Sequence, residues 1–371
     1  MSKVRLGDVA VEHKETCKNN KNGYPIVGLE HLIPEEITLS NWDEGSDNTF
    51  SKVFRKGNVL FGRRRAYLKK AAVAPFDGIC SGDITVIEAL PDKILPELLP
   101  FIIQNDALFD YAVGKSAGSL SPRVKWEHLQ NYEFELPELS KQKELADILW
   151  AMDETKKSYQ KLIFATDELV KSQFIEWFGS PIKNEKKWES AKMSDVAPAD
   201  VFKGKVESVD NLYWLLNLDM IESNTGRVIE KVRVPLKDIG TSTYAFSTEN
   251  VLFSKLRPYL NKVIVPDENG YATTELIPLM PDREKLNIDF FTSLLRGDEF
   301  LSFIETQVSG TKMPRVQMNV FWNFDVILPP IELQEQFAEF VRQSDKSKFE
   351  LEQALSELTA TYKRIISDNL G

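Results

Sequence analysis

A run of basic and aromatic residues, positions 58–70, carries the side chains with the clearest binding chemistry. Val59-Leu60-Phe61 has the composition of a buried strand, and a cluster of hydrogen-bond donors follows it. These donors are Arg63, Arg64, Arg65, Tyr67 and Lys69. The planar fork of arginine suits phosphate oxygens and the O6 and N7 atoms of guanine, and tyrosine can pack against a sugar or donate to a phosphate. We call residues 58–70 the basic strip and interpret it as a nucleic-acid contact.

The strip occurs a second time, at residues 250–262. Eight of the 13 paired positions are identical, whereas ordinary residue frequencies predict about one match by chance. The second strip keeps Lys255, Arg257, Tyr259 and Lys262 in phase with the first. Exposed edge strands also carry Lys and Arg, which prevent aggregation, and either tyrosine could equally pack in a core. The repetition favours DNA contact over a solvated edge.

A loop at residues 116–123, echoed at 309–315, is the second candidate surface. Both copies combine small hydroxyl residues, a glycine, a proline and basic residues, a composition that lets a loop approach a DNA backbone closely. The candidate contacts are Ser119, Arg123, Lys312 and Arg315. The alternative for each loop is a plain turn. Asp83 and Glu275 also occupy equivalent positions; we expect them to be structural, with contact to cytosine N4 or to a neighbouring arginine as alternatives.

The net charge of the chain is −10, which by itself argues against a nucleic-acid partner. The charge is unevenly distributed, however, because residues 51–76 contain eight basic residues and no acid. An acidic protein with a confined basic strip remains a candidate for DNA binding.

Catalytic and metal-binding motifs are missing from the sequence. Gly114-Lys115-Ser116 resembles the end of a phosphate-binding loop, but Phe109 stands where that loop needs a glycine. The three histidines, His13, His31 and His128, are too dispersed for a zinc site. We therefore expect no catalytic residue, no metal and no cofactor in this chain, and no enzymatic activity of its own.

The N-terminus, the length of the apolar runs and the cysteines indicate the cellular compartment. The N-terminus has no apolar signal region, and no apolar run reaches the roughly 18 residues that a bilayer span requires. Only Cys17 and Cys80 occur, in no disulfide or metal spacing. These features predict a cytoplasmic protein without a membrane partner.

The duplication extends over the whole chain. From about Gly57 onward the two copies align at an offset of 192 residues, and short β-like runs alternate in both with helical segments at 97–111 and 288–305. This predicts an α+β fold with two homologous mixed α/β domains, residues 1–137 and 181–329. Segments 33–56 and 222–248 do not align with one another.

Each domain is followed by a long helix, at residues 138–180 and 330–371. About 40 residues without Pro or Gly follow Pro137 and Pro330. An apolar seam with polar gaps indicates an imperfect coiled coil, and each helix could reach roughly 55–60 Å at 1.5 Å per residue. If the halves are related by a pseudo-twofold axis, the helices pair antiparallel.

The pattern as a whole resembles the specificity subunit of type I restriction–modification systems. It is carried by the two strips and by the L-P-x-x-x-x-Q start of each helix, Leu136-Pro137 to Gln142 and Leu328-Pro329 to Gln334. The resemblance implies two target-recognition domains that read the halves of a bipartite double-stranded DNA target. The helices would act as a spacer and as the dock for two modification (methyltransferase) subunits.

The resemblance also implies where the chemistry resides. S-adenosylmethionine and adenine-N6 methylation would belong to the modification subunits, and ATP and Mg²⁺ to a restriction subunit, a further partner that the family allows. Two alternatives stay open at this point. One is the specificity subunit of a type II-like methyltransferase–nuclease, and the other is a pseudo-symmetric protein scaffold that does not bind DNA.

Overall fold

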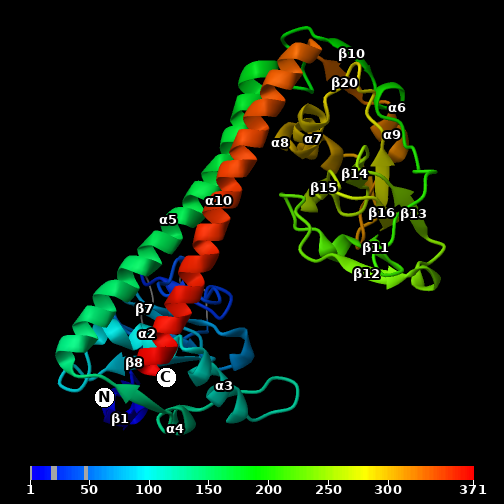
Figure 1. The fold of residues 1–371 in the computed structure, drawn as a ribbon. Helices are drawn as coiled ribbons and strands as arrows, with labels where there is room; N and C mark the ends of the chain where they lie inside the picture. Colours follow the sequence, from blue (N-terminus) through cyan, green and yellow to red (C-terminus); the bar gives the residue numbers. More distant parts are fainter. Residues whose placement is uncertain (1, 18–22, 46–48) are drawn as a thin grey trace. The chain divides into compact units, whose positions relative to one another are not determined.

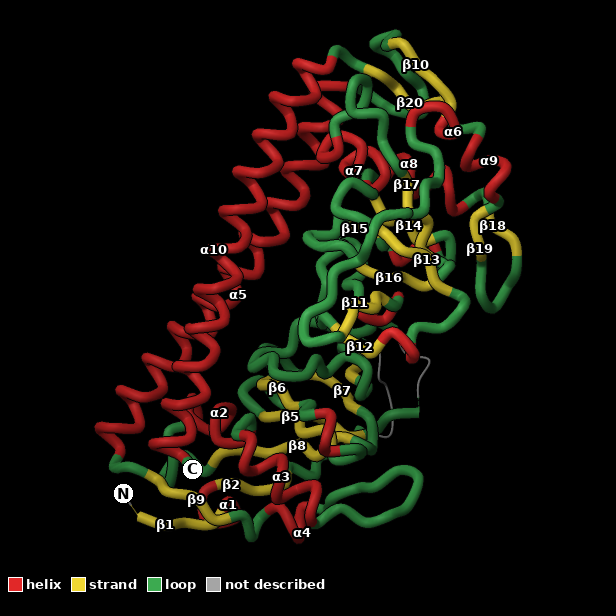
Figure 2. The backbone as a smooth tube through the Cα atoms, turned by 45° about the vertical axis from the view of Figure 1, so that its right-hand side comes forward, coloured by secondary structure: helices red, strands yellow, loops and turns green. Residues whose placement is uncertain are grey.

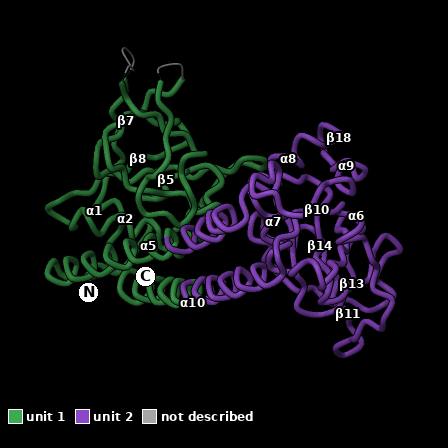
Figure 3. The backbone as a smooth tube through the Cα atoms, turned by 90° about the horizontal axis from the view of Figure 1, so that it is seen from above, with its two compact units in different colours: residues 1–161, 352–371 green, residues 162–351 purple. Residues whose placement is uncertain are grey.

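The computed structural model describes residues 2–17, 23–45 and 49–371 and divides into two compact units (Figure 1, Figure 3). Unit 1 contains residues 1–161 and 352–371, and unit 2 contains residues 162–351. Each boundary falls inside a long helix, so each unit holds one globular domain together with part of both helices. Positions 46–48 of the non-aligning segment 33–56 lie outside the described residues.

Unit 1 is built on two small sheets (Figure 2). The antiparallel sheet has the order β2 (Ala10–Glu12), β8 (Ile84–Ala89), β5 (Val59–Gly62) and β6 (Ala71–Val73). The mixed sheet has the order β3 (Ile26–Val27), β7 (Gly78–Cys80) and β4 (Lys52–Phe54). A separate antiparallel pair joins β1 (Ser2–Arg5) to β9 (Glu133–Leu136).

Unit 2 also has two small sheets. The sheet that contains its basic strip has three strands and the other sheet has four, the reverse of unit 1. The four-stranded sheet has the order β12 (Val232–Pro235), β11 (Leu212–Leu216), β16 (Gly270–Thr273) and β13 (Thr243–Phe246). The three-stranded sheet has the order β15 (Val263–Ile264), β14 (Val251–Ser254) and β17 (Leu276–Leu279). Two further pairs are β10 (Glu189–Lys192) with β20 (Asp325–Leu328) and β18 (Val308–Ser309) with β19 (Arg315–Val316).

The apolar start of each basic strip is a strand that separates two cores. In β5, Val59 and Phe61 belong to one buried cluster while Leu60 belongs to another. Alternate side chains of a strand point to opposite faces, so a strand covered on both faces must be apolar throughout. In β14, Val251 and Phe253 likewise pack apart from Leu252. The prediction of a buried strand at each strip is confirmed.

The predicted helical segments are shorter than the pattern indicated. Residues 97–111 are divided among η2 (Pro96–Leu98), α2 (Leu99–Ile103) and α3 (Asp106–Gly114). The break occurs because Asn105 has an extended backbone and caps α3 by accepting from the amide of Ala107. Residues 288–305 divide in the same place into α7 (Ile288–Arg296) and α8 (Asp298–Glu305), with extended Gly297 between them.

The remaining helices are short. They are α1 (Leu6–Val9), η1 (Ala66–Leu68), α4 (Trp126–Leu129), α6 (Met193–Val196), η3 (Leu218–Met220), η4 (Leu236–Asp238), η5 (Pro258–Leu260) and α9 (Met318–Trp322). Across the described residues, no helix has both the length and the apolarity needed to cross a membrane.

The long helices α5 (Leu139–Phe178) and α10 (Ile331–Leu370) lie side by side within each unit and run in opposite directions (Figure 1, Figure 2). In unit 2 the ring of Phe174 lies 5.7 Å from that of Phe337, and Asp167, earlier in α5, pairs with Lys348, later in α10, at 2.7 Å. In unit 1 the core that contains Leu145 of α5 also contains Leu370 of α10. The predicted antiparallel pairing is thus confirmed within each unit.

The buried glutamine near the start of each long helix explains the repeated L-P-x-x-x-x-Q motif. Gln142 is 2% exposed; its Oε1 accepts from the Leu95 amide at 2.8 Å and its Nε2 donates to the Pro137 carbonyl at 2.8 Å. Gln334 is fully buried and makes the same two contacts, with the amide of Asn287 at 2.9 Å and the carbonyl of Pro329 at 2.7 Å. Each glutamine therefore ties its helix to the domain before it.

The two thiols should differ sharply in reactivity. Burial in the β3-β7-β4 region raises the pKa of the Cys80 thiol to about 12, and the nearby Lys52 ammonium only partly opposes this shift. Because the thiolate is the nucleophile, Cys80 should resist alkylation in the native protein at pH 8, while half-buried Cys17 reacts. Counting labelled thiols by mass spectrometry before and after denaturation checks this. Equal labelling rates of both thiols in the native protein would contradict the described core.

Candidate nucleic-acid interface

Each basic strip leaves its strand through a turn of fixed geometry. In unit 1 the turn η1 is bracketed by Arg65 and Lys69, both in the left-handed region with φ of 55° and 50°. In unit 2 the turn η5 is bracketed by Arg257 and Asn261, with φ of 50° and 45°. Left-handed backbone is uncommon for residues other than glycine, so four instances at two equivalent positions mark a repeated feature of the fold.

This turn exposes one tyrosine in each unit. Tyr67 is 55% exposed and Tyr259 is 48% exposed. The alternative that these rings pack in a core is therefore wrong. Arg65 beside Tyr67 is exposed as well, whereas Arg257 is half-buried. The two strips present similar aromatic groups with different amounts of accessible charge.

The second candidate surface, the loop, lies directly against the strip in both units. In unit 1 the Arg65 amide donates to the Pro122 carbonyl at 2.8 Å, and the Val124 amide donates to the Arg63 carbonyl at 3.0 Å. Unit 2 has the same two bonds, from Arg257 to Pro314 at 2.7 Å and from Val316 to Lys255 at 2.9 Å. Two segments predicted separately from the sequence therefore form one continuous surface, which we call the strip–loop surface.

A carboxylate holds the loop arginine in place. Asp83 accepts from Nε of Arg123 at 2.7 Å and from Nη2 at 3.1 Å, and Nη1 of Arg64 lies 3.6 Å from its Oδ2. The hydrogen bond from Arg123 holds the pKa of the Asp83 carboxyl below its usual range. In unit 2, Glu275 pairs with Arg315 at 3.1 Å. Of the roles considered for these acids, contact with a neighbouring arginine is the one that the structure shows.

The remaining candidate residues divide into outward-facing and internally bonded groups. Ser119 and Lys312 are exposed on their loops. Lys262 instead donates to the Leu218 carbonyl at 2.7 Å, and burial lowers its pKa. The Nε atoms of Arg63 and Arg257 are buried and find no hydrogen-bond partner within the described part of the chain. Lys262 thus anchors the strip to the segment that follows β11.

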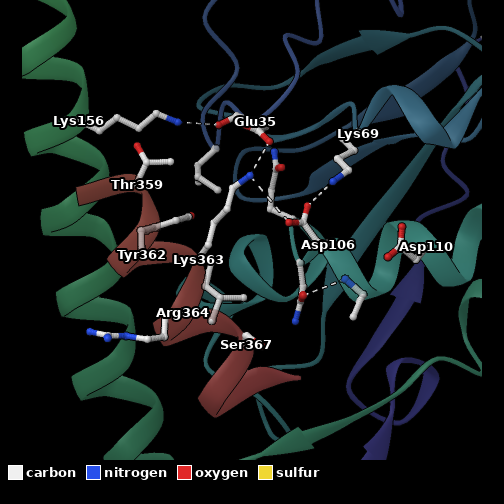
Figure 4. Close-up of a pocket in the computed structure, with 15 residues that line it drawn as sticks. Glu35, Lys69, Asp106, Asp110, Lys156, Thr359, Tyr362, Lys363, Arg364 and Ser367 are labelled. Carbon is white, nitrogen blue, oxygen red and sulfur yellow. Dashed lines mark hydrogen bonds and ion pairs between the residues drawn. The ribbon is translucent and has the colours of Figure 1, made fainter. Parts of the chain in front are cut away.

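Lys69 points away from the strip into a charged pocket of about 390 Å³ in unit 1 (Figure 4). Its ammonium pairs with Asp106 at 2.6 Å. Lys363 of α10 lies across the pocket and pairs with Glu35 at 2.8 Å, and its Nζ is 3.8 Å from Asp106. Lys69 therefore links the strip to α3, and its ammonium is already matched by the Asp106 carboxylate, which Lys363 of α10 also approaches.

The predicted contacts omit the exposed apolar residues of the strip–loop surface. Leu120 lies in the loop of unit 1 and is 90% exposed. The predicted contacts are all side chains that donate hydrogen bonds, and an aliphatic residue does not meet that criterion. The exposure of Leu120 could have been predicted from its position in a run of small polar residues, where no neighbouring apolar residue could bury it.

The side chains of the strip–loop surface are suited to binding. It offers guanidinium, hydroxyl and phenol donors on a rigid backbone frame, and no described group of His, Cys, Asp and Glu is arranged to hold a metal ion. Such a surface can bind phosphate and base edges. It is repeated in two units of one chain.

Comparison with known proteins identifies the family of this chain. The family profile described as type I restriction modification DNA specificity domain matches residues 1–164 and 185–359. The EcoDI type I restriction enzyme specificity subunit of Escherichia coli is 24% identical over 123 residues, an alignment that covers 33% of this chain. The chain spans 27% of the length of this curated relative.

Solved structures share the fold over almost the full chain. A structure described as the basis of complex assembly and conformational transition of the type I R-M system superposes with a TM-score of 0.58 at 18% identity, covering 99% of this chain and 97% of the other. The type I restriction–modification S subunit from M. genitalium gives a TM-score of 0.56 at 12% identity, covering 98% and 94%. The matched profile spans most of the sequence and describes a DNA specificity domain, not a catalytic one. The chain belongs to the type I restriction modification DNA specificity family.

Proposed function

We propose that this chain is the DNA specificity subunit of a type I restriction–modification complex. In this proposal each globular domain reads one half of a bipartite double-stranded target. The observation that carries the proposal is the duplicated strip–loop surface, in which the same backbone hydrogen bonds join the same two segments in both units. Family membership favours this function over that of a protein scaffold without DNA binding.

The strip–loop surfaces of the two units present different side chains. This difference supports the proposal that the two domains recognise different half-sites. Arg64 in unit 1 corresponds to Leu256 in unit 2, and Leu120 corresponds to Lys312. Base discrimination depends on side-chain identity, while backbone frames only set position. A protein that recognises two different half-sites needs the same backbone arrangement in both domains with different side chains on it.

The proposal assigns the chemistry to partner subunits. Two methyltransferase subunits, docked on α5 and α10, would hold S-adenosylmethionine and methylate adenine at N6. A restriction subunit would hold ATP and Mg²⁺. The acidic net charge of −10 fits a chain that touches DNA over confined surfaces and offers the rest to proteins.

A domain exchange tests the proposal. Residues 1–137 are replaced by the first domain of another family member, the chimera is expressed with its methyltransferase subunits, and N6-methyladenine sites are mapped by sequencing. We expect one half of the methylated site to change and the other half to stay, because each domain has its own strip–loop surface. The reciprocal exchange of residues 181–329 should change the other half.

Two outcomes would reject the proposal. A change of both half-sites in one chimera would show that the domains do not read independently. Methylation with no bipartite preference in the parent complex would show that this chain is not the specificity subunit.

A further inference from the structure

Leu120 is more exposed than any other large apolar side chain within the described residues. Its exposed fraction is 90%, and the next value, that of Phe164 on α5, is 67%. The side chain lies in the loop that follows α3, between Gly118 and Pro122. Singly exposed apolar residues are common on protein surfaces, so exposure alone assigns no role. The surroundings of Leu120 supply the argument.

The frame that carries Leu120 is fixed at its base. The Ala117 amide donates to the Arg123 carbonyl at 3.0 Å, and the Arg123 amide returns a bond to Ala117 at 2.9 Å. Nε of Arg64 donates to the Ser121 hydroxyl at 2.6 Å. Gly118 has a φ of 114°, which allows the tight turn before the tip. Leu120 is therefore held outward by a closed loop.

Three arginines and one carboxylate, Asp83, surround the base of the loop. Arg64, Arg65 and Arg123 all belong to the segments joined there. Guanidinium groups of this kind contact phosphates and set the depth at which a loop meets DNA. A side chain exposed at the tip of a loop held in this way is placed to reach the bases. Contact with a phosphate does not stabilise an aliphatic group, whereas burial against base faces lowers the free energy of the complex.

Leucine and methionine are among the residues that proteins insert between base steps. The loop of unit 2 has the same plan, with Gly310 at a φ of 91° before its tip and a methionine, Met313, that is 47% exposed. Its base is the β18–β19 pair. An apolar side chain of an inserting type thus occurs between the glycine and the proline of both loops.

We propose that Leu120 inserts between base pairs of the half-site read by unit 1. In unit 2 the aligned residue is Lys312, and we propose that Met313, one position nearer the proline, inserts in its place. This inference rests on the proposed DNA specificity function and adds a mechanism to it. Inserted residues unstack one base step, and flexible pyrimidine–purine steps are the least costly to open. Leu120 is then a specificity-determining residue that recognises deformability in place of a hydrogen-bond pattern.

The test uses the full chain in complex with its methyltransferase subunits and a duplex that carries the mapped target. 2-Aminopurine replaces one adenine of a half-site at a time, because its fluorescence rises on unstacking. Apart from the methylated adenine, which a methyltransferase extrudes from the stack, we expect one position in the half-site of unit 1 to brighten on binding. Leu120→Ala should abolish that signal and weaken specific binding about 10- to 100-fold, the worth of one buried leucine side chain. Leu120→Met should retain both properties within about threefold.

Two further variants distinguish insertion from a general loss of apolar surface and from a phosphate contact. Val11→Ala removes an exposed apolar group on β2 and should change neither the fluorescence nor the affinity. Leu120→Lys should raise the slope of log affinity against log salt by about 0.9 if its ammonium meets a phosphate, while still losing the unstacking signal. Thermal unfolding should be unchanged in the Leu120 variants, because Leu120 is 90% exposed and makes little contact with the fold.

The outcomes that would overturn the inference differ from those that would reject the DNA function. Unchanged affinity and fluorescence in Leu120→Ala, with the parent complex still specific, would reject insertion alone. Loss of methyltransferase subunits from Leu120→Ala on size-exclusion chromatography would assign the leucine to a protein contact instead. A parent complex without target preference would reject the proposed function itself.

Discussion

Replacing Arg64, Arg65 and Arg123 together by alanine is expected to weaken DNA binding about 10²- to 10⁴-fold near physiological salt. These three arginines surround the contact between strip and loop in unit 1. Each phosphate contact that is lost should reduce the slope of log affinity against log salt by about 0.9, so the slope should fall by roughly 2 to 3. Fluorescence anisotropy of the complex at several salt concentrations measures both quantities.

Asp83 enlarges this effect. In the native protein its carboxylate is matched by Arg123 at 2.7 Å and approached by Arg64 at 3.6 Å. With both arginines removed, an unpaired negative charge would face the phosphate backbone. Adding Asp83→Asn to the triple variant should therefore recover part of the lost affinity.

The control removes the same charge from elsewhere in unit 1. Lys3, Lys14 and Lys93 are exposed and lie outside the strip–loop surface, so their joint replacement by alanine should weaken binding far less. Similar losses in the two triple variants would show that binding depends on total charge. That result would contradict a defined interface at the strip and loop.

Replacing Gln142 by leucine is expected to lower the free energy of unfolding of unit 1 by about 2–4 kcal/mol. Leucine has a similar volume but leaves the Leu95 amide and the Pro137 carbonyl without partners in a buried site. Gln334→Leu should have an effect of the same size in unit 2, where Asn287 and Pro329 lose their partner. Urea unfolding followed by hydrogen exchange, which reports each unit separately, measures the two losses.

Gln160 provides the matched control on the same helix. It is exposed on α5, and Gln160→Leu should change the unfolding free energy by no more than about 0.5 kcal/mol. If Gln142→Leu also stays within that range, the buried hydrogen bonds do not stabilise the start of the helix. If Gln142→Leu lowers the stability of both units equally, the two units do not unfold separately.

The sequence alone predicted the duplication, the long helices and the apolar strand of each basic strip. The duplication is an identity between segments at a constant offset of 192 residues, and the long helices are runs without Pro or Gly. The strand of the first strip could be predicted because Val59, Leu60 and Phe61 are all apolar. Each of these features is recorded in the residue types themselves, so composition, periodicity and the comparison of one segment with another are sufficient to find it.

Contacts between distant segments were not readable in this way. The hydrogen bond from Arg65 to Pro122 joins residues far apart in the chain, and nothing in either segment specifies the other. The helical segment 97–111 was predicted as continuous because its apolar spacing is helical on both sides of Asn105. Only the extended backbone at that residue shows the break.

By itself, the sequence determined that this protein has two homologous α+β domains, a basic strip in each and a long helix after each. The tertiary structure decided which donors of the strips remain available. In the folded chain Lys69 pairs with Asp106, and Lys262 donates to a carbonyl. Arg123 pairs with Asp83, and Leu120 is exposed to solvent. The physical reason is that a residue's type sets the bonds its side chain can make, whereas the partners that compete for those bonds are brought near only when distant segments pack together.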